Sequence, residues 1–227
     1  MPTHTDKIYE LELKDLRDKL LAMGGKVEAA AAASVRAITE RDAALGEKVK
    51  ASDAEVNRLE VEIDNACRRL LALRQPAASD LRFITTALKI VTDLERMGDL
   101  AVNIAERAID LAQAPPLAPM HDLVTLAELS ESQLKRALDA FVERDPVKAE
   151  DVIQGDSVLD ALYHKLFNDL LAQMMEDPRA IRRATALMFV AKHLERFGDH
   201  AINVGEMVVY MVRGTDVRHP GSRELAK

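Results

Sequence analysis

The sequence predicts an all-α protein made of two similar three-helix bundles, with six long antiparallel helices arranged as a pseudo-symmetric tandem repeat. The first observation is a repeat: residues 93–108 read DLERMGDLAVNIAERA, and residues 193–208 read HLERFGDHAINVGEMV. Polar residues recur in register in the two segments, which chance similarity between apolar stretches would not produce. Repetition at a fixed interval indicates two copies of one structural unit. The second observation is that apolar residues recur at helical spacing along the chain, with no alternation typical of strands.

The first copy contains three predicted helices. Apolar residues at helical spacing predict the first over residues 8–41, with one buried and one solvated face. The second covers residues 44–74 and stops where a proline follows, because proline cannot continue a helix. The third begins near Ser79 and Asp80, whose side chains are suitable N-caps, and ends before Pro115.

The second copy repeats this pattern. A fourth helix is predicted over residues 121–144, and a fifth starts at Asp145, where an N-cap is followed by proline in the first turn. The fifth helix continues to about Met175. The same start signal at Asp177 opens the sixth helix, which ends near Gly214, a residue suited to a helix C-terminus.

These elements divide the chain into two units of about 100 residues each, a common domain size. The first unit is predicted at residues 1–114 and the second at residues 121–214. A linker rich in Ala and Pro occupies residues 115–120, and residues 215–227 are predicted to form a flexible tail.

Composition narrows the class of protein. Of 227 residues, 48% are hydrophobic and 30% are charged, as expected for a globular protein, and aromatic residues make up only 4%. No apolar run is long enough for a transmembrane helix, the charged start does not resemble a secretory signal, and Cys67 is the only cysteine. We therefore expect a cytoplasmic protein. The net charge of −7 argues against nucleic acid as a partner.

Acidic residues form four pairs spaced four apart, two pairs in each copy. That spacing places both side chains of a pair on one face of a helix. Counted from the turns between helices, the pairs on antiparallel neighbours lie at nearly the same height. Four carboxylates facing one another need compensation from arginine or from a hard cation such as Mg²⁺, Ca²⁺, Mn²⁺ or iron. The predicted metal ligands are Glu60, Asp64, Glu95, Asp99, Asp156, Asp160, Glu195 and Asp199.

A simpler interpretation is that these stripes are solvated helix faces. Arg96 and Arg196 lie three residues before Asp99 and Asp199, close enough for ion pairs within the helix. His164 would add a nitrogen ligand to the second cluster alone. The sequence contains no recognisable nucleophile, phosphate-binding loop or HExxH motif, so we expect a binding and regulatory protein that is not an enzyme.

The strings LLALRQPAASDLR (70–82), LKIVTDLERMGDLAVNIAERA (88–108) and HLERFGDHAINVGEMVVYMVRG (193–214) resemble the PhoU family of phosphate-signalling proteins. The resemblance spans nearly the whole chain and implies two similar three-helix bundles, with a homodimer as the usual assembly. It further implies a negative regulator of the phosphate-starvation response. Such a regulator links the ATPase subunit of a phosphate ABC transporter to a sensor histidine kinase and meets the membrane only through these partners.

The family's metal-binding pattern, E/D-x-x-x-D, corresponds to the four acidic pairs already named. The resemblance implies multinuclear iron or zinc there, or other divalent cations such as Mg²⁺ and Mn²⁺, without fixing the metal. Two alternatives stay open. One is a metal-storage protein or a metal-dependent enzyme on a helical scaffold, and the other is a phosphate-transport accessory protein without a kinase partner.

Overall fold

A computed structural model describes residues 4–117 and 120–217. Within these residues the secondary structure is helical and contains no strand, which confirms the predicted fold class. The elements are α1 (His4–Thr39), α2 (Ala43–Arg74), α3 (Ala78–Ala112), α4 (His121–Glu143), α5 (Pro146–Gln154), α6 (Asp156–Glu176), the 3₁₀ turn η1 (Pro178–Ala180) and α7 (Ile181–Arg213).

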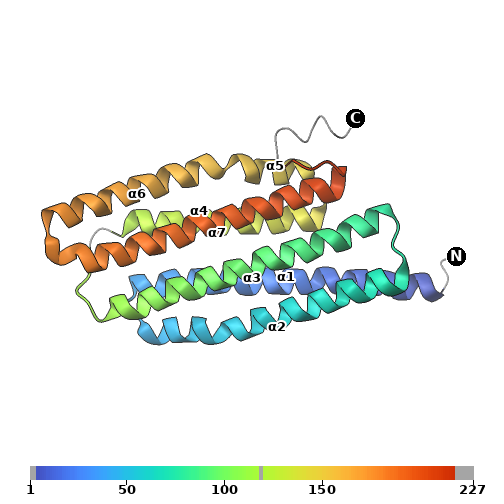
Figure 1. Cartoon of the computed structure of the whole chain (residues 1–227), viewed down its shortest axis with the longest axis horizontal. Coiled ribbons are helices and arrows are strands. Elements are labelled where there is room, and N and C mark those ends of the chain that lie inside the picture. The colour runs from blue at the N-terminus through green and yellow to red at the C-terminus, as the bar shows by residue number, and fades with distance from the viewer. Residues whose placement is uncertain (1–3, 118–119, 218–227) are drawn as a thin grey trace.

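The helices lie along a common long axis (Figure 1). α3 packs against α1 and α2, and α7 packs against α4, α5 and α6. Each copy is therefore a helical bundle whose last helix contacts all of its other helices. α3 and α7 also pack against each other, and α1 packs against α4. The repeated segments at 93–108 and 193–208 therefore lie on the two helices that join the copies.

Several helix ends are set by the residues that the sequence indicates. Asp42 caps α2 by accepting a hydrogen bond from the Leu45 backbone N–H at 2.9 Å. The Asp145 carboxylate accepts hydrogen bonds from two backbone N–H groups in the first turn of α5. Gly214 ends α7 in the left-handed region at φ 73°, and its N–H donates to the Tyr210 carbonyl. These contacts satisfy backbone groups that a helix terminus leaves without partners.

Three boundaries differ from the prediction. Ser79 and Asp80 do not cap the third helix, which begins at Ala78 with no side-chain cap. Asp177 does start a helical segment, but the first turn is 3₁₀ before α7 begins at Ile181. The fifth helix is divided into α5 and α6 at Gly155, where ψ is −7°. Glycine is among the weakest helix formers, which explains why the break falls there.

The hydrophobic core runs through both copies. Phe83 of α3 and Phe141 of α4 stack with their ring centroids 5.7 Å apart, and both rings are buried. At the other end of the molecule, Ile104 of α3 lies in one buried cluster with Leu126 of α4 and Leu194 of α7. The copies therefore bury apolar surface against each other as well as within themselves.

The helices stop on both sides of the predicted linker and before the predicted tail. α3 ends at Ala112, α4 begins at His121, and α7 ends at Arg213. Part of the linker (118–119) and most of the tail (218–227) lie outside the described residues. The proposed domain limits and the flexibility of the tail stay predictions.

Candidate functional site

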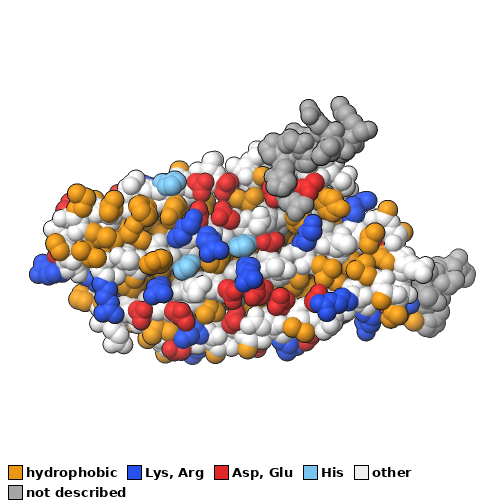
Figure 2. Space-filling view, viewed as in Figure 1, with side chains coloured by type: hydrophobic (Ala, Val, Ile, Leu, Met, Phe, Trp, Pro, Cys, Tyr) orange, Lys and Arg blue, Asp and Glu red, His pale blue; other side chains and the backbone are white. Residues whose placement is uncertain are grey.

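The eight predicted ligands lie on two pairs of neighbouring helices. α2 and α3 carry the acids of the first copy, and α6 and α7 carry those of the second. Figure 2 shows acidic side chains gathered in two areas of one face, one over α2 and α3 and the other over α6 and α7, with basic side chains between them. The predicted acids therefore divide into two groups, one on α2 and α3 and one on α6 and α7.

The second group brings together all four of its predicted acids. Burial raises the pKa of Asp156 above its ordinary value, and the negative charges of Asp160 and Glu195 raise it further. Burial likewise raises the pKa of Asp199, together with the charges of Glu195, Asp156 and Asp160. These mutual effects mean that the four carboxylates lie within reach of one another's electrostatic field.

Partial compensation comes from one lysine. Lys192 Nζ donates hydrogen bonds to both carboxylate oxygens of Glu195, each at 2.6 Å. Asp156 begins α6, a position where the helix dipole favours a negative charge. Its Oδ1 atom is nevertheless buried without a hydrogen-bond partner among the described residues. A buried carboxylate oxygen without a partner is uncommon in folded proteins.

The first group differs from the predicted set. Burial raises the pKa of Glu95, followed by the charges of Asp99, Glu60 and Asp53, while Arg96 opposes the shift. Asp53, seven residues before Glu60, was not among the eight predicted ligands. Helical spacing places Asp53 on the same stripe of α2 as Glu60, and the packing of α2 against α3 brings its charge close to Glu95.

Asp64 has a different environment from the one predicted for it. It forms an ion pair with Arg68, one turn further along α2, and it is not among the charges that shift Glu95. In the second group, His164 packs beside the Tyr163 ring, with centroids 5.3 Å apart, and is not among the groups that shift Asp156 or Asp199.

Arg96 of the repeated motif tests the interpretation that the acidic stripes are solvated helix faces with ion pairs to arginine. Arg96 lies 3.4 Å from a Glu95 oxygen and 3.5 Å from an Asp99 oxygen. Because the Arg96 side chain is 59% exposed, these pairs are weak in water. In the first group, arginine therefore supplies part of the compensation that the cluster needs.

The glycines of the motif allow close helix packing beside the acids. A Cβ atom on Gly98 would lie 3.2 Å from Val56 Cγ1 and 3.5 Å from Asp53 Oδ1 on α2. A Cβ atom on Gly198 would lie 2.8 Å from Gln133 Oε1 and 2.9 Å from Leu159 Cδ1. Because glycine has no side chain, α2 can approach α3 closely at Gly98, and α4 and α6 can approach α7 closely at Gly198, beside the carboxylates.

A polar contact between the copies was not foreseen. Asp93 Oδ1 lies 2.9 Å from His200 Nδ1 and accepts a hydrogen bond from Asn203 Nδ2 at 3.1 Å. His200 and Asn203 belong to the repeated segment of α7, whereas Asp93 lies on α3. No spacing rule within one helix could reveal this contact, because it depends on the packing of α3 against α7.

The fit to a metal ion is incomplete in this conformation. Oxygen-rich donor sets suit hard cations, and both groups supply them. Among residues 4–117 and 120–217, however, no three His, Cys, Asp or Glu side chains are placed together so that they could hold a metal ion. The donors are close enough to interact, but side chains would have to turn to converge on one ion. Metal binding therefore stays a prediction.

The described helices lack the properties of membrane-spanning helices. In the part of the chain that the structure describes, none of them combines the length and apolar character that crossing a membrane requires.

Comparisons with a family model and with known proteins point to the same family. The family model described as PhoU domain matches twice, at residues 20–108 and 123–208, which confirms the tandem repeat. A Pseudomonas putida protein named phosphate-specific transport system accessory protein PhoU homolog is 42% identical over 98% of this chain and 87% of that protein. The protein of the same name from Aquifex aeolicus is 41% identical over 94% of this chain and 96% of its own length.

Solved structures agree with the sequence comparison. The crystal structure of PhoU from Pseudomonas aeruginosa has a TM-score of 0.88 at 42% identity, covering 91% of this chain and 100% of that one. The phosphate transport system regulatory protein PhoU from Streptococcus pneumoniae gives 0.85 at 32% identity, covering 93% and 100%. These relatives are named accessory or regulatory proteins, in agreement with the prediction that this chain is not an enzyme. The chain belongs to the PhoU family.

Proposed function

We propose that the chain is a negative regulator of the phosphate-starvation response and of phosphate uptake. It acts as a non-catalytic cytoplasmic adaptor that links the ATPase subunit of a phosphate ABC transporter to a sensor histidine kinase. The observation that carries this proposal is the match, over nearly the full chain, to relatives named phosphate-specific transport system accessory proteins. In this role the chain favours the inactive state of the kinase when phosphate is plentiful.

An adaptor needs two surfaces that partners can occupy together, and the ends of the bundle are suitable. The turn between α2 and α3 and the turn between α6 and α7 lie at opposite ends of the molecule (Figure 1). Near the first turn, Leu73 is 69% exposed, and near the second, Met175 is 80% exposed. We assign one partner-binding surface to each of these two ends.

Copurification with single-site variants tests the adaptor. The chain would be purified from cells whose transporter ATPase and kinase carry separate tags, as wild type, Leu73→Asp and Met175→Asp. Because both side chains are exposed, the variants should fold, which circular dichroism would check. We expect wild type to retain both partners and each variant to lose one of them. Failure of the wild type to retain either partner would contradict the adaptor.

We further propose that the chain forms a homodimer, as the family resemblance implies. Light scattering coupled to size-exclusion chromatography should give about twice the monomer mass at micromolar concentration. A monomer mass across the accessible concentration range would contradict this assembly and leave the adaptor proposal standing.

A second proposal concerns metal. We infer that the acidic groups bind a divalent cation or a multinuclear iron or zinc centre. Support comes from the raised pKa values of Asp156 and Asp199 and from the Asp156 oxygen that lacks a partner among the described residues. A cation would neutralise these charges and occupy that oxygen.

Elemental analysis tests metal binding directly. Protein purified without a metal-binding tag would be compared with the variant Glu95→Ala, Asp99→Ala, Glu195→Ala, Asp199→Ala, after both are shown to fold. Metal in the wild type and none in the variant is the expected result. Equal metal content in the two proteins would show that the stripes are solvated faces or partner surfaces.

A further inference from the structure

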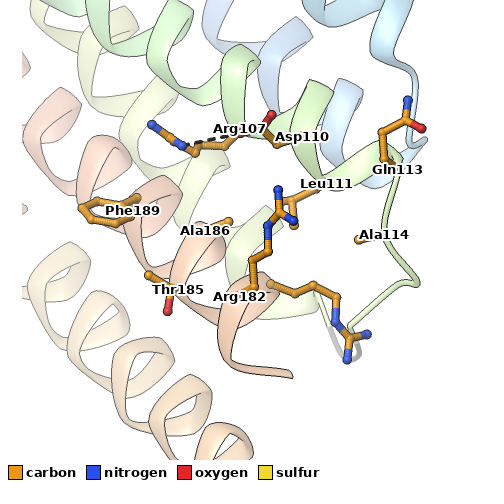
Figure 3. Close-up of a pocket in the computed structure, with 10 residues that line it drawn as sticks. Arg107, Asp110, Leu111, Gln113, Ala114, Arg182, Thr185, Ala186 and Phe189 are labelled. Carbon is orange, nitrogen blue, oxygen red and sulfur yellow. Dashed lines mark ion pairs between the residues drawn. The ribbon is translucent and has the colours of Figure 1, made fainter. Parts of the chain in front are cut away.

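A basic hollow lies away from the acidic groups, between the C-terminal end of α3 and the first turns of α7. Its volume is about 320 Å³, within the range of sites that bind small molecules. Figure 3 shows its residues coming from two segments far apart in the sequence, with Arg107, Asp110 and Gln113 on one side and Arg182, Thr185 and Phe189 on the other.

Positive charge in the hollow exceeds negative charge. Arg107, Arg182 and Arg183 line it, and Asp110 is the only acidic residue among the described residues that line it. Asp110 Oδ2 lies 3.6 Å from Arg107 Nη1, and its side chain is 60% exposed, so it neutralises Arg107 only in part. Two net positive charges thus line one hollow of a protein whose net charge is −7.

Two of the arginines have donors without acceptors. Arg182 forms no hydrogen bond or ion pair with any of the residues that the structure describes. Arg107 Nε is buried and has no hydrogen-bond partner in residues 4–117 and 120–217. Arg183, by contrast, donates to the carbonyls of Pro115 and Pro116, and so holds the segment between the copies in place.

The other copy offers an internal comparison, because Arg82 occupies the position of Arg182 one hundred residues earlier. Arg82 Nε donates to the Met211 carbonyl at 3.2 Å, near the end of α7. The corresponding carbonyl near the end of α3 is that of Leu111, and it already accepts a hydrogen bond from the Ala114 N–H. The arginine that donates to a backbone carbonyl in one copy therefore has no protein acceptor among the described residues in the other, and its exposed guanidinium is free to contact a ligand.

The same comparison shows that the hollow has diverged between the copies. Met207 corresponds to Arg107, and Lys89 corresponds to Phe189. Phe189 is 53% exposed, and the Arg107 guanidinium lies 5.9 Å from the centre of its ring. An exposed aromatic face beside guanidinium groups can pack against a planar ring while the arginines hold an anion.

We propose that this hollow binds a phosphate-bearing anion, whose phosphoryl oxygens are held by Arg107 and Arg182. Guanidinium groups match phosphate oxygens in geometry as well as in charge. The anion has two possible sources with this chemistry, inorganic phosphate and a nucleotide whose base lies against Phe189. The site lies apart from the acidic groups and does not depend on the adaptor proposal.

Calorimetric titration of the full chain tests the site, with inorganic phosphate in one arm and ATP without metal in the other. The variants are Arg107→Ala and Arg182→Ala. Arg179→Ala is the matched control, because it removes the same charge nearby from a residue that is 90% exposed and paired with Asp177. Because Arg182 has no partner to lose, its variant is expected to fold, which circular dichroism would check.

We expect at least one of the two ligands to bind the wild type. That ligand should bind Arg179→Ala with the same affinity as the wild type. Each pocket variant should bind roughly tenfold or more weakly, since each loses a charge-assisted contact. Binding of ATP without binding of phosphate would identify a nucleotide as the ligand. Binding of phosphate at least as tight as that of ATP would identify free phosphate. Absence of binding by both ligands, or equal weakening in Arg179→Ala, would overturn the proposal.

Discussion

At the scale of single residues, burial shifts the pKa of acidic side chains outside the two acidic groups as well. Glu131 of α4 is an example. Burial raises its pKa from the ordinary value of 4.5 to about 7, with further contributions from the charges of Glu128 and Glu28. Glu28 lies on α1, so this cluster of acids lies where the two copies meet.

Replacing Glu131 by glutamine should stabilise the protein at neutral and higher pH. The folded state holds the Glu131 proton more tightly than the unfolded chain, so its stability falls as pH rises from about 4.5 through about 7. Allowing for partial exposure, Glu131→Gln should be about 1–2 kcal/mol more stable at pH 8 and equal to wild type near pH 4. Urea unfolding at both pH values measures this, and equal stability at pH 8 would contradict it.

Gly198 and Gly25 should respond oppositely to alanine. In Gly198→Ala the new methyl group would collide with Leu159 and Gln133, which are both buried, and should cost about 1–3 kcal/mol. Nothing lies within 4 Å of a Cβ atom on Gly25, inside α1. Gly25→Ala should therefore stabilise by about 0.5–1 kcal/mol. Chemical denaturation of both variants checks the pair, and a neutral Gly198→Ala would show that the packing beside the motif is not tight.

At the scale of elements, the ends of helices depend on side chains that can be tested singly. The Asp145 carboxylate accepts hydrogen bonds from the Val147 N–H at 2.9 Å and the Lys148 N–H at 3.2 Å. Asp145→Ala should lower the free energy of unfolding by about 1 kcal/mol, whereas Asp145→Asn keeps the acceptor and most of the stability. Equal losses in the two variants, measured by urea unfolding, would contradict the capping role.

The sequence predicted helices well where local chemistry sets their limits and less well where packing does. Asp145 with its following proline and Gly214 act within a few residues, and both appear in the structure as predicted. The break at Gly155 could not be placed, because a single glycine is often tolerated inside a helix.

The candidate site shows the same limit. Spacing along one helix and heights along neighbouring helices predicted two groups of four acids, and in the second group Asp156, Asp160 and Glu195 all contribute to the raised pKa of Asp199. Asp53 entered the first group, and Asp64 turned to Arg68, because the contact between α2 and α3 decides which carboxylates meet. The basic hollow was missed for the same reason, since Arg107 and Arg182 are 75 residues apart and meet only through tertiary packing.

At the scale of the whole molecule, contacts between the copies should make them unfold as one unit. Phe83 stacks on Phe141, and Asp93 contacts His200 and Asn203 across the boundary. Asp93→Ala should therefore lower the stability of both copies by about 1 kcal/mol, because the half-buried His200 and Asn203 side chains lose their acceptor. Hydrogen exchange measures each copy separately, and loss of protection confined to the first copy would contradict this coupling.

The central claim is that this protein restrains the phosphate-starvation response when phosphate is plentiful. The most direct measurement is the expression of starvation-induced genes in excess phosphate, in a strain that lacks the protein and in the same strain with the gene restored. We predict high expression without the protein and repression on restoration. Normal repression in the strain that lacks the protein would contradict the claim.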